Sequence, residues 1–578
     1  MTATGSNTLG APYTPDARQG MTARLPWLLP AVLIGLLAVA WFSTLGVRAL
    51  ISPDEGRYAT LSLGMLQTGD WITPRLNGLL YFEKPALQYW MGALLFKIFG
   101  VSEFSARLWP ALSGFLTVLC VGFTAGRLWG RETGLRALAI CASMTWVMGN
   151  SFYLTLDAGL TLWLTLALCS MLLAHAPAVS GSASRRWVLL AWAAMAMAVL
   201  SKGLVGILIP GTTLVLLCMW ERSMAWWRGM HWLAGGLLFL AIAAPWFVVV
   251  SMRNPSFAEF FFIHEHFTRF LTTSHRRVGA WWYYVPLLLA GALPWTGALV
   301  WPFLRGAPRA TGDAGSAGDQ SATALRTQRR VLLAWSGFVF LFFSVSGSKL
   351  PSYILPMFPA LALLMAERLR TLSTGALRAV LLVPVVGWLL ALVATTQVDH
   401  FVSANSPATA IVPMAHAVRA GAGIFMLGAI AAWLLLRRDR RTAAVLGMAL
   451  FHIVALEAVL LSHDTFGRLK SSVDLARAVA PYIDADSPVY AVSDYDQTLP
   501  FYLRRNVVLV DYVDEFELGQ KAEPGKSLAT VDDFIRQWGP APKAAAYMSH
   551  ATWQGLAQRG VPMRVVFQDP RRVMVVKP

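Results

Sequence analysis

The sequence predicts a polytopic α-helical membrane protein that ends in a small soluble α/β domain. Hydrophobic residues make up 56% of the 578 residues and charged residues only 14%, whereas soluble domains are about one quarter charged. The mean hydropathy is +0.53, and the apolar residues come in blocks long enough to cross a bilayer. From residue 464 onward these blocks stop, and short strands alternate with short helices.

The apolar blocks lie close to the ~17–25 residues that a membrane-spanning helix needs, and they predict about thirteen such helices. The first block is too long for the apolar core of a signal peptide and no small-residue cleavage site follows it, so we expect it to be retained. The expected spans are near 26–48, 105–126, 134–151, 157–176, 186–200, 203–220, 231–251, 281–304, 330–346, 352–369, 376–397, 414–436 and 442–462.

Arginines concentrate in every second connection between the spans, namely 127–136, 185–186, 222–228, 305–330, 368–378 and 437–441. This alternation follows the positive-inside rule and places these connections in the cytoplasm. The net charge of +17 therefore reflects topology, and we expect no nucleic-acid partner because no basic stripe with interleaved aromatics occurs in the far-side segments.

The same topology divides the chain into three parts. Residues 1–25 form a cytoplasmic tail, residues 26–463 the transmembrane domain, and residues 464–578 a soluble domain on the far side. Two far-side stretches of the transmembrane domain, 49–104 and 252–282, are long enough to carry function. All four cysteines lie within apolar segments, which is typical of small core residues and leaves neither a disulfide framework nor a cysteine metal site.

The soluble domain is expected to be a compact α/β unit, because strands alternate with helices along it. The order of expected elements is helix 471–483, strand 489–492, helix 499–503, strand 507–510, helix 531–538, strand 544–548, helix 551–559, and strands 563–568 and 572–576. We find no glycine-rich phosphate loop and no catalytic triad in it, so its role stays open between a scaffold and a docking surface.

The stretch 49–104 begins with a run of residues that predicts a helix N-terminus. Ser52 is expected as the N-cap, Pro53 as the first helical residue and Glu55 as the residue that closes a capping box. Asp54 gains from the helix dipole, but an acid directly beyond a membrane helix, one turn from Arg57, is also a candidate catalytic or sugar-binding carboxylate.

Cationic residues in both far-side stretches could hold a phosphate. Lys84, next to a proline and among aromatics, could do so as a point charge, although an interfacial lysine can also snorkel to the membrane surface. Arg269 could pair with a phosphate through two parallel hydrogen bonds. His264 and His266 are spaced poorly for two ligands on one helix face, so a zinc site would need a third residue such as Glu83.

Ionisable side chains also stand at the ends of three expected membrane spans. They are Asp157, Lys202 and Lys349, with Tyr353 close behind the last of them. Charged groups at such positions are costly and commonly face a cavity or a partner. Snorkelling would explain the two lysines, but it does not explain Asp157.

Taken together, these segments resemble the 4-amino-4-deoxy-L-arabinose (aminoarabinose) transferases. The resemblance covers essentially the whole chain. It is most specific in the first far-side stretch; the segments 200–204 and 348–356 occur more widely. The segments are 52–59 (SPDEGRYA), 69–71 (GDW), 77–78 (NG), 81–85 (YFEKP), 200–204 (LSKGL), 264–267 (HEHF) and 348–356 (SKLPSYILP).

The resemblance implies a GT-C membrane fold shared with protein O-mannosyltransferases and oligosaccharyltransferases. It also implies inverting transfer of aminoarabinose from undecaprenyl phosphate to lipid A phosphates at the outer face of the bacterial inner membrane, which confers resistance to polymyxin and other cationic peptides. Asp54 would be the central carboxylate, with Lys84 and Arg269 on the donor phosphate. Sugar or acceptor contacts would come from Glu55, Arg57, Tyr58, Tyr81, Asp157, Lys202, His266, Lys349 and Tyr353.

Three alternatives stay open at this point. A bound metal is not required, although zinc at Glu83 and His264 is conceivable. A protein O-mannosyltransferase-like enzyme would use the same donor class but a serine or threonine acceptor, and the segment 81–85 argues for the aminosugar branch. A lipid or sugar transporter is disfavoured because the sequence has no inverted repeat of broken helices and its polar residues gather at one membrane face.

Overall fold

The structure is a computed structural model that describes residues 28–268, 279–305, 316–403 and 406–578, without the side chains of 28–30, 264–268, 301–305 and 316–321. The chain divides into two compact units, residues 1–43 and 44–578. In the first unit the described part is one apolar helix, α1 (Leu28–Ser43). The cytoplasmic tail expected at 1–25 lies outside the described residues. All further elements belong to the second unit.

The fold confirms the expected polytopic helical protein. Eight helical stretches in the described parts of the chain are long and apolar enough to cross a membrane, and α1 and α9 (Val205–Glu221) are shorter apolar helices. The eight stretches contain α4 (Glu103–Trp129), α7 (Asp157–Ala174), α8 (Gly181–Lys202), α11 (Trp232–Arg253), α16 (Ser316–Val345), α18 (Thr374–Ala394), α19 (Ala408–Arg437) and α20 (Arg441–Gly467). The count of about thirteen spans therefore stays a prediction.

The three other expected spans are each broken into two helices. The pairs are α5 (Arg131–Ser143) with α6 (Thr145–Ser151), α14 (Tyr284–Gly291) with α15 (Thr296–Arg305), and η2 (Pro351–Met357) with α17 (Phe358–Arg368). Two of the breaks meet, because the backbone N–H of Thr145 donates to the carbonyl of Leu293 over 3.0 Å. Backbone groups freed by a break are tolerated at membrane depth when other parts of the protein satisfy them in this way.

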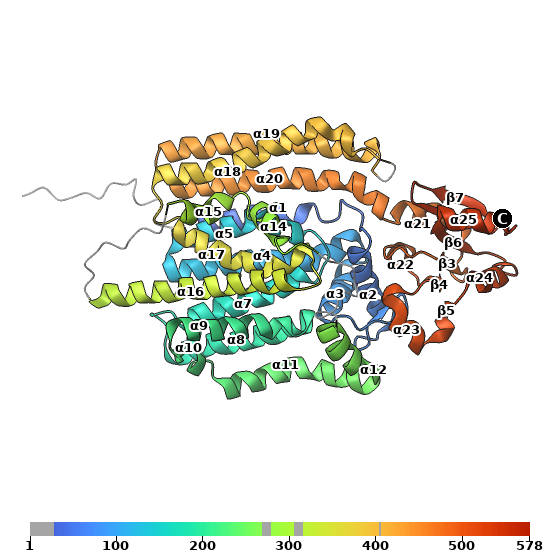
Figure 1. The fold of residues 1–578 in the computed structure, drawn as a ribbon, viewed down its shortest axis with the longest axis horizontal. Helices are drawn as coiled ribbons and strands as arrows, with labels where there is room; N and C mark the ends of the chain where they lie inside the picture. Colours follow the sequence, from blue (N-terminus) through green and yellow to red (C-terminus); the bar gives the residue numbers. More distant parts are fainter. Residues whose placement is uncertain (1–27, 269–278, 306–315, 404–405) are drawn as a thin grey trace, which may run out of the picture. The chain divides into compact units, whose positions relative to one another are not determined.

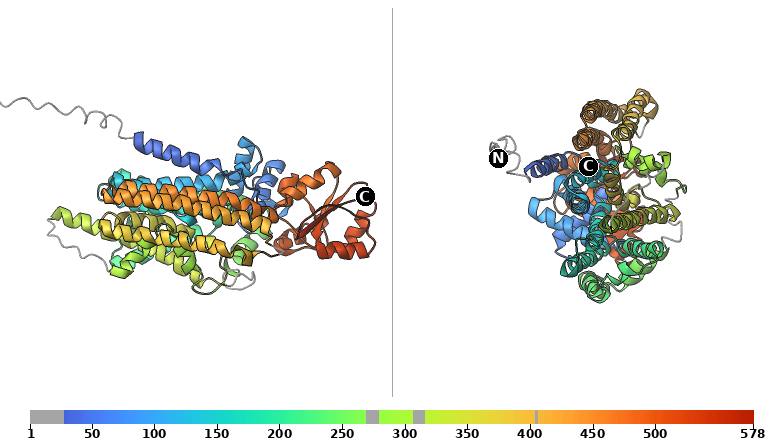
Figure 2. Two further views of the ribbon diagram at one scale, coloured as in Figure 1. Left: turned by 90° about the horizontal axis from the view of Figure 1, so that it is seen from above. Right: turned by 90° about the vertical axis from the view of Figure 1, so that its left-hand side faces the viewer.

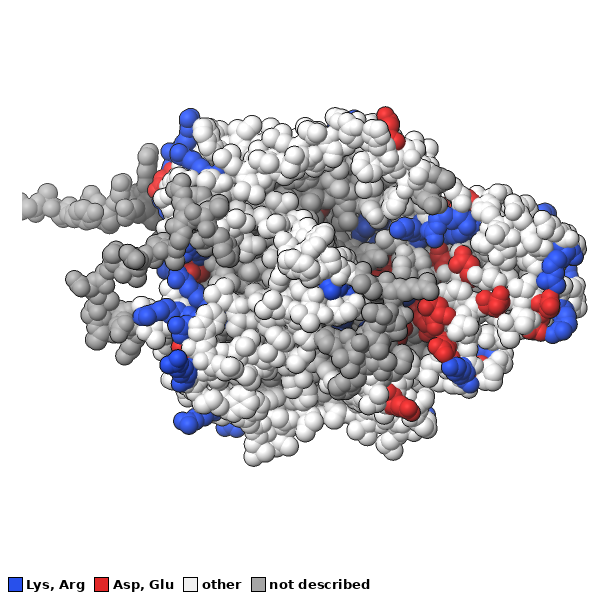
Figure 3. All heavy atoms as spheres, in the orientation of Figure 1, with Lys and Arg blue, Asp and Glu red and all other residues white. Residues whose placement is uncertain are grey.

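The membrane helices pack side by side in the second unit (Figures 1 and 2). Helix α19 packs against α20 and α18, α8 lies between α7 and α11, and α4 contacts both α5 and α7. The face in Figure 3 carries basic residues at the end of the helices away from the C-terminal domain, almost no charge along the middle, and both signs at the other end. This distribution is typical of a protein that crosses a bilayer.

The connection between the first two spans folds into its own small structure. It contains α2 (Asp54–Thr68), a two-stranded hairpin of β1 (Arg75–Leu76) and β2 (Leu79–Leu80), and α3 (Leu87–Phe99). The hairpin turn is Asn77-Gly78, and both residues have positive φ, 50° and 80°. Two consecutive positive φ angles are what a two-residue hairpin turn of this kind requires, which explains the Asn-Gly pair.

Short elements complete the transmembrane part. They are α10 (Ala225–Arg228), α12 (Ser256–Ala258), the π-helix η1 (Glu259–Thr268), and the 3-10 turns η3 (Thr395–Phe401) and η4 (Arg468–Lys470). The far-side stretch expected at 252–282 thus contains α12 and η1.

The C-terminal domain is the expected α/β unit. Its six-stranded sheet has the order β5-β4-β3-β6-β8-β7, in which the first four strands are parallel and β8 and β7 form an antiparallel hairpin. Every expected strand and helix is present. The strands are β3 (Val489–Val492), β4 (Val508–Val510), β5 (Ser527–Leu528), β6 (Ala545–Ser549), β7 (Arg564–Gln568) and β8 (Arg572–Val576). The helices are α21 (Val473–Val479), α22 (Leu499–Leu503), α23 (Glu517–Ala522), α24 (Val531–Trp538) and α25 (His550–Gln558), with short turns η5 (Ala480–Tyr482), η6 (Asp514–Phe516) and η7 (Pro524–Lys526).

Candidate active site

Asp54 is the first residue of α2, and its carboxylate is 30% exposed. Its Oδ1 accepts a hydrogen bond of 2.8 Å from Nη1 of Arg57, one turn further along the helix. Two acids in the first turn of α2 lie where the helix dipole favours negative charge. The start of α2 therefore presents one accessible carboxylate that a guanidinium holds in place.

The expected capping box at the start of α2 is wrong. The N-cap position is Pro53, and no side chain caps the helix. The Ser52 hydroxyl instead donates to Oε1 of Gln497 in the C-terminal domain over 2.6 Å. Glu55 pairs with the guanidinium of Arg107 and accepts a 3.1 Å hydrogen bond from the backbone N–H of Ile51, whereas the N–H of Ser52 donates to the carbonyl of Lys470. Long-range contacts thus replace the local capping that the sequence suggested.

Glu55 and Arg107 form a fully buried ion pair beneath the site. Both side chains are 0% exposed, and two parallel bonds of 2.7 Å join the guanidinium to the two carboxylate oxygens. Arg107 also donates to the carbonyls of Leu45, Arg48 and Ala49 at 2.6–3.1 Å, so all five of its N–H groups are used. Burial alone would raise the pKa of Glu55, but Arg107 holds it below its usual value. The pair fixes the segment that leads into α2.

Asp157, Lys202 and Tyr353 form one cluster in the structure, although they are far apart in the sequence. The ammonium of Lys202 pairs with Oδ1 of Asp157 and lies 4.5 Å from the centre of the Tyr353 ring. Ser352 donates to Oδ2 of Asp157 over 2.7 Å. Lys202 is therefore held by a partner and does not snorkel to the membrane surface. Lys349 donates to the carbonyl of Ser346 over 2.7 Å and makes none of these contacts.

Buried tyrosines interact electrostatically with the charges of the site. Burial raises the pKa of Tyr58, and the carboxylates of Asp54 and Asp157 both add to the rise, so both acids lie within electrostatic range of this phenol. Burial and Glu83 likewise raise the pKa of Tyr81. Tyr58 therefore links the start of α2 electrostatically to the cluster around Asp157.

The C-terminal domain supplies one wall of this site. Glu515, at the turn η6, pairs with Nε of Arg57 and accepts a 2.9 Å hydrogen bond from the amide of Gln497. Burial raises the pKa of Glu515; Arg57 opposes this rise and Glu83 adds to it. The domain therefore contacts the residue that holds Asp54.

Close backbone contact fixes how the domain docks on the connection. A Cβ at Gly56 would lie 2.5 Å from the backbone of Gln497 and Thr498, so α2 can approach this closely only with glycine there. Asn77 donates to the carbonyl of Val507 and accepts from its N–H, both over 2.8 Å. One apolar core continues from α2 and α3 into the sheet of the C-terminal domain.

The expected phosphate and metal ligands are only partly described. Lys84 is half-buried and donates to the carbonyl of Glu83 over 2.6 Å. Arg269 and the side chains of His264 and His266 lie outside the described residues, although the backbone of both histidines belongs to η1. Among the described residues no group of three or more His, Cys, Asp or Glu side chains could hold a metal ion.

Comparisons with known proteins agree with the fold. Residues 475–577 match the aminoarabinose transferase C-terminal domain, and residues 9–261 match the dolichyl-phosphate-mannose-protein mannosyltransferase family. The fold is similar to the crystal structure of ArnT from Cupriavidus metallidurans bound to undecaprenyl phosphate, with a TM-score of 0.88 and 35% identity over 96% of this chain and 98% of that one. The apo ArnT structure gives a TM-score of 0.86.

The chain belongs to the aminoarabinose transferase family. A curated relative is the undecaprenyl phosphate-alpha-4-amino-4-deoxy-L-arabinose arabinosyl transferase of Erwinia tasmaniensis, which is 35% identical over 344 residues. That alignment covers 58% of this chain and 59% of the relative. Like these relatives, the chain is a multi-pass membrane protein with the glycosyltransferase fold that the sequence predicted.

Three residues of this transferase site were missed by sequence reasoning. Arg107 was counted within a membrane span, Ser352 was noted only as part of a motif, and Glu515 lies in an acidic run of the soluble domain. Ser352 and Glu515 carry no local signal, because each becomes important only through a partner far away in the sequence. An arginine or aspartate inside an apolar segment is the one hint available, and it was used for Asp157 but not for Arg107.

Proposed function

We propose that the chain transfers 4-amino-4-deoxy-L-arabinose from undecaprenyl phosphate to the phosphate groups of lipid A. The observation that carries the proposal is the match to ArnT bound to undecaprenyl phosphate, which covers 96% of this chain and 98% of the ArnT chain. A lipid-linked donor demands a site at the membrane surface, and Asp54 lies directly beyond a membrane helix with its carboxylate partly exposed. Members of this family named for undecaprenyl phosphate aminoarabinose support the donor assignment.

The charges at the site suit such a displacement. As the sugar leaves its donor, negative charge grows on the departing phosphate, and cations prepared in advance stabilise it. Lys84 and Arg269 are the residues that we assign to this task. A lipid A phosphate is already an oxyanion at neutral pH and needs no general base, so Asp54 would orient the sugar or stabilise positive charge that develops on it.

The exposure of the carboxylates at the site favours a single displacement with inversion. Of the four carboxylates that the site holds in ion pairs, Asp54 is 30% exposed, whereas Glu55, Asp157 and Glu515 are 0–6% exposed. A double displacement would need a second carboxylate free to attack the sugar. The arginine-rich connections support a location in the bacterial inner membrane, with the site and the C-terminal domain on the periplasmic side. In the cell, the added amine would lower surface negative charge and protect against polymyxin.

The test uses the purified full-length protein with undecaprenyl-phosphate aminoarabinose and lipid A, followed by mass spectrometry of the acceptor. We expect the wild type to add the mass of the sugar and Asp54→Asn to lose this activity. Asp532→Asn is the matched control, because Asp532 is 67% exposed in a surface ion pair, and it should retain transfer. Activity that survives in Asp54→Asn would remove Asp54 from the mechanism while leaving the function intact.

Two further arms address the alternatives. The match of residues 9–261 to protein mannosyltransferases favours a hydroxyl acceptor as the second candidate. Transfer to a serine-containing peptide but not to lipid A would establish that reading. A bound metal is not required by the proposed reaction, and a zinc ion at Glu83 and His264 is tested by dialysis against a chelator. Loss of activity that added zinc restores would establish the metal.

A further inference from the structure

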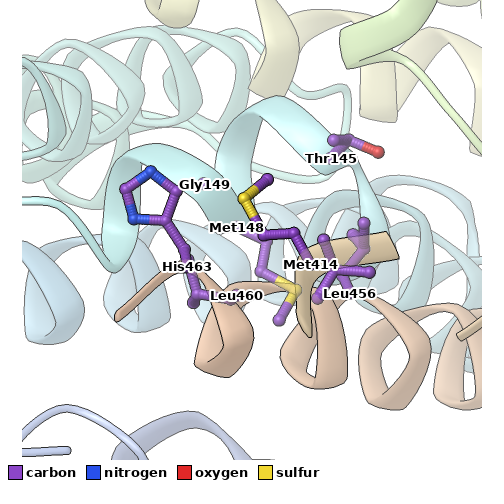
Figure 4. Close-up of a pocket in the computed structure, with 8 residues that line it drawn as sticks. Thr145, Met148, Gly149, Met414, Leu456, Leu460 and His463 are labelled. Carbon is purple, nitrogen blue, oxygen red and sulfur yellow. The ribbon is translucent and has the colours of Figure 1, made fainter. Parts of the chain in front are cut away.

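The cavity in Figure 4 has no lysine, arginine or acid among the described residues that line it. It lies between α6, α19 and α20, with a volume of about 200 Å³, and Thr145 and His463 are its polar lining residues. A phosphate group therefore finds no ion-pair partner there. Charged partners lie instead where the C-terminal domain meets the start of α2.

One guanidinium at this junction is shared by two carboxylates. Nη1 of Arg57 donates to Oδ1 of Asp54 over 2.8 Å, and Nε of Arg57 pairs with Oε2 of Glu515. In this position the Arg57 side chain is only 13% exposed, so Arg57 has to turn before its fork of N–H groups can meet a phosphate. Asp54 lies on the same helical turn and moves with Arg57. The bond that such a turn breaks is therefore the one to Glu515.

Glu515 needs another donor whenever Arg57 leaves it. Its side chain is 5% exposed, and a buried carboxylate is strongly unfavourable unless it is paired and hydrogen-bonded. The amide of Gln497 donates to Oε1 of Glu515 over 2.9 Å, which leaves Oε2 to Arg57. The loss of Arg57 would thus leave Oε2 without its donor.

The C-terminal domain holds a donor in reserve beside Glu515. Tyr495 is 5% exposed, and its hydroxyl has no hydrogen-bond partner among the described residues. Its ring packs edge-on against Phe516, the residue after Glu515, with the ring centres 5.0 Å apart. Burial raises the pKa of the Tyr495 phenol, and Glu515 is the nearby charge that adds most to the rise. An unpartnered buried hydroxyl is unfavourable and uncommon, and phenylalanine would fill the same space without it. Packing therefore does not explain this hydroxyl.

We propose that Tyr495 is a positioning residue whose hydroxyl donates to Oε2 of Glu515 when Arg57 turns toward a substrate phosphate. Glu515 then alternates between two partners. The exchange frees Arg57 to hold the phosphate next to Asp54, while Gln497 keeps the C-terminal domain docked on the segment before α2. This inference rests on the proposed function, which supplies the phosphate from either the polyprenyl donor or lipid A.

The test uses Tyr495→Phe, which removes only the hydroxyl. Without ligand we expect an apparent Tm equal to or above that of the wild type, because the variant loses an unpartnered buried group. The affinity for undecaprenyl phosphate or for lipid A, measured by native mass spectrometry of the purified full-length protein, should fall about tenfold, because hydrogen bonds to charged groups are among the stronger ones. The ligand that loses affinity is the one whose phosphate Arg57 holds.

Two further variants isolate the exchange. Tyr482→Phe is the matched control, because Tyr482 is 41% exposed in the same domain, and it should leave both affinities unchanged. In a Glu515→Gln background, Tyr495→Phe should cause no further loss of affinity, since its effect passes through Glu515. A further tenfold loss in that background would overturn the exchange.

Other outcomes of the same measurements also decide the inference. Unchanged affinities for both ligands in Tyr495→Phe would overturn it. A Tm well below that of the wild type would overturn it too, because the hydroxyl would then be structural. Binding keeps the inference separate from the proposed function: if the wild type binds these ligands but transfers no sugar, and Tyr495→Phe binds one of them more weakly, the function fails and the exchange stands.

Discussion

Replacing Glu55 by glutamine tests the buried support beneath the site. The change leaves the Arg107 guanidinium charged and without its carboxylate, in surroundings where both side chains are 0% exposed. Breaking a buried ion pair by removing one partner costs about 3–5 kcal/mol of unfolding free energy. An exposed pair is worth only about 0–1 kcal/mol, so Asp532→Asn, which breaks the surface pair of Asp532 with Arg559, is the matched control.

The assay is thermal unfolding in detergent, followed by tryptophan fluorescence at one fixed scan rate because large proteins commonly unfold irreversibly. We expect a clear drop in apparent Tm for Glu55→Gln and almost none for Asp532→Asn. Arg107→Met should lower the apparent Tm too. The double variant should lose less stability than the two single variants lose together, because it leaves no unpaired buried charge. Equal Tm values for Glu55→Gln and the wild type would refute the structural role of the pair.

The pair also predicts a pH dependence. Arg107 holds the folded-state pKa of Glu55 below its ordinary value of 4.5. A lowered carboxyl pKa gives stability that is complete above the ordinary pKa and is lost as the pH falls through the lowered one. The wild type should therefore lose stability as the pH falls below the ordinary pKa of 4.5 and through the lowered pKa of Glu55. The difference in Tm between the wild type and Glu55→Gln should shrink over the same pH range.

Two further predictions concern the docking of the C-terminal domain. Gly56→Ala would stabilise a free helix by about 1 kcal/mol, but the new Cβ would lie 2.5 Å from backbone atoms of the domain. We therefore expect lower stability. We also expect a large loss of transfer activity, because displacement of a reacting group by about 1 Å can lower the rate 10²-fold. A rise in Tm with full activity would contradict the docked arrangement. Glu515→Gln weakens a charge-assisted bond to Arg57 that is worth about 1.5–3 kcal/mol, so kcat should fall about tenfold to a hundredfold with little change in acceptor KM. An unchanged kcat would show that Arg57 does not need this partner.

The sequence was sufficient wherever structure depends on local patterns. Apolar blocks located the membrane helices, because the length of a span is set by the thickness of the bilayer. In the soluble domain, alternating strands and helices gave every expected element in its place, since turn residues and apolar periodicity act over a few residues. Asp54 became a candidate for the same reason, because its position at the start of a helix beyond an expected membrane span is a local feature; its role in the reaction stays a prediction.

The structure decided what those elements do to one another. The breaks at Met144 and Leu293 are stabilised by a backbone hydrogen bond between the two segments. The sequence of either segment alone does not predict this bond, because its partner lies in the other segment. The expected capping box failed because both of its partners bond to distant segments: Glu55 pairs with Arg107, 52 residues away, and the backbone N–H of Ser52 donates to the carbonyl of Lys470.

The composition of the site was decided in the same way. Lys202 meets Asp157 across 45 residues, Ser352 meets it across 195, and Glu515 reaches Arg57 across 458. The sequence by itself determined a membrane protein that resembles glycosyltransferases, with a candidate acid at the start of its first long connection. Only the tertiary structure joined that acid to the far domain, because ion pairs between distant segments depend on packing, which leaves no periodic trace in the chain.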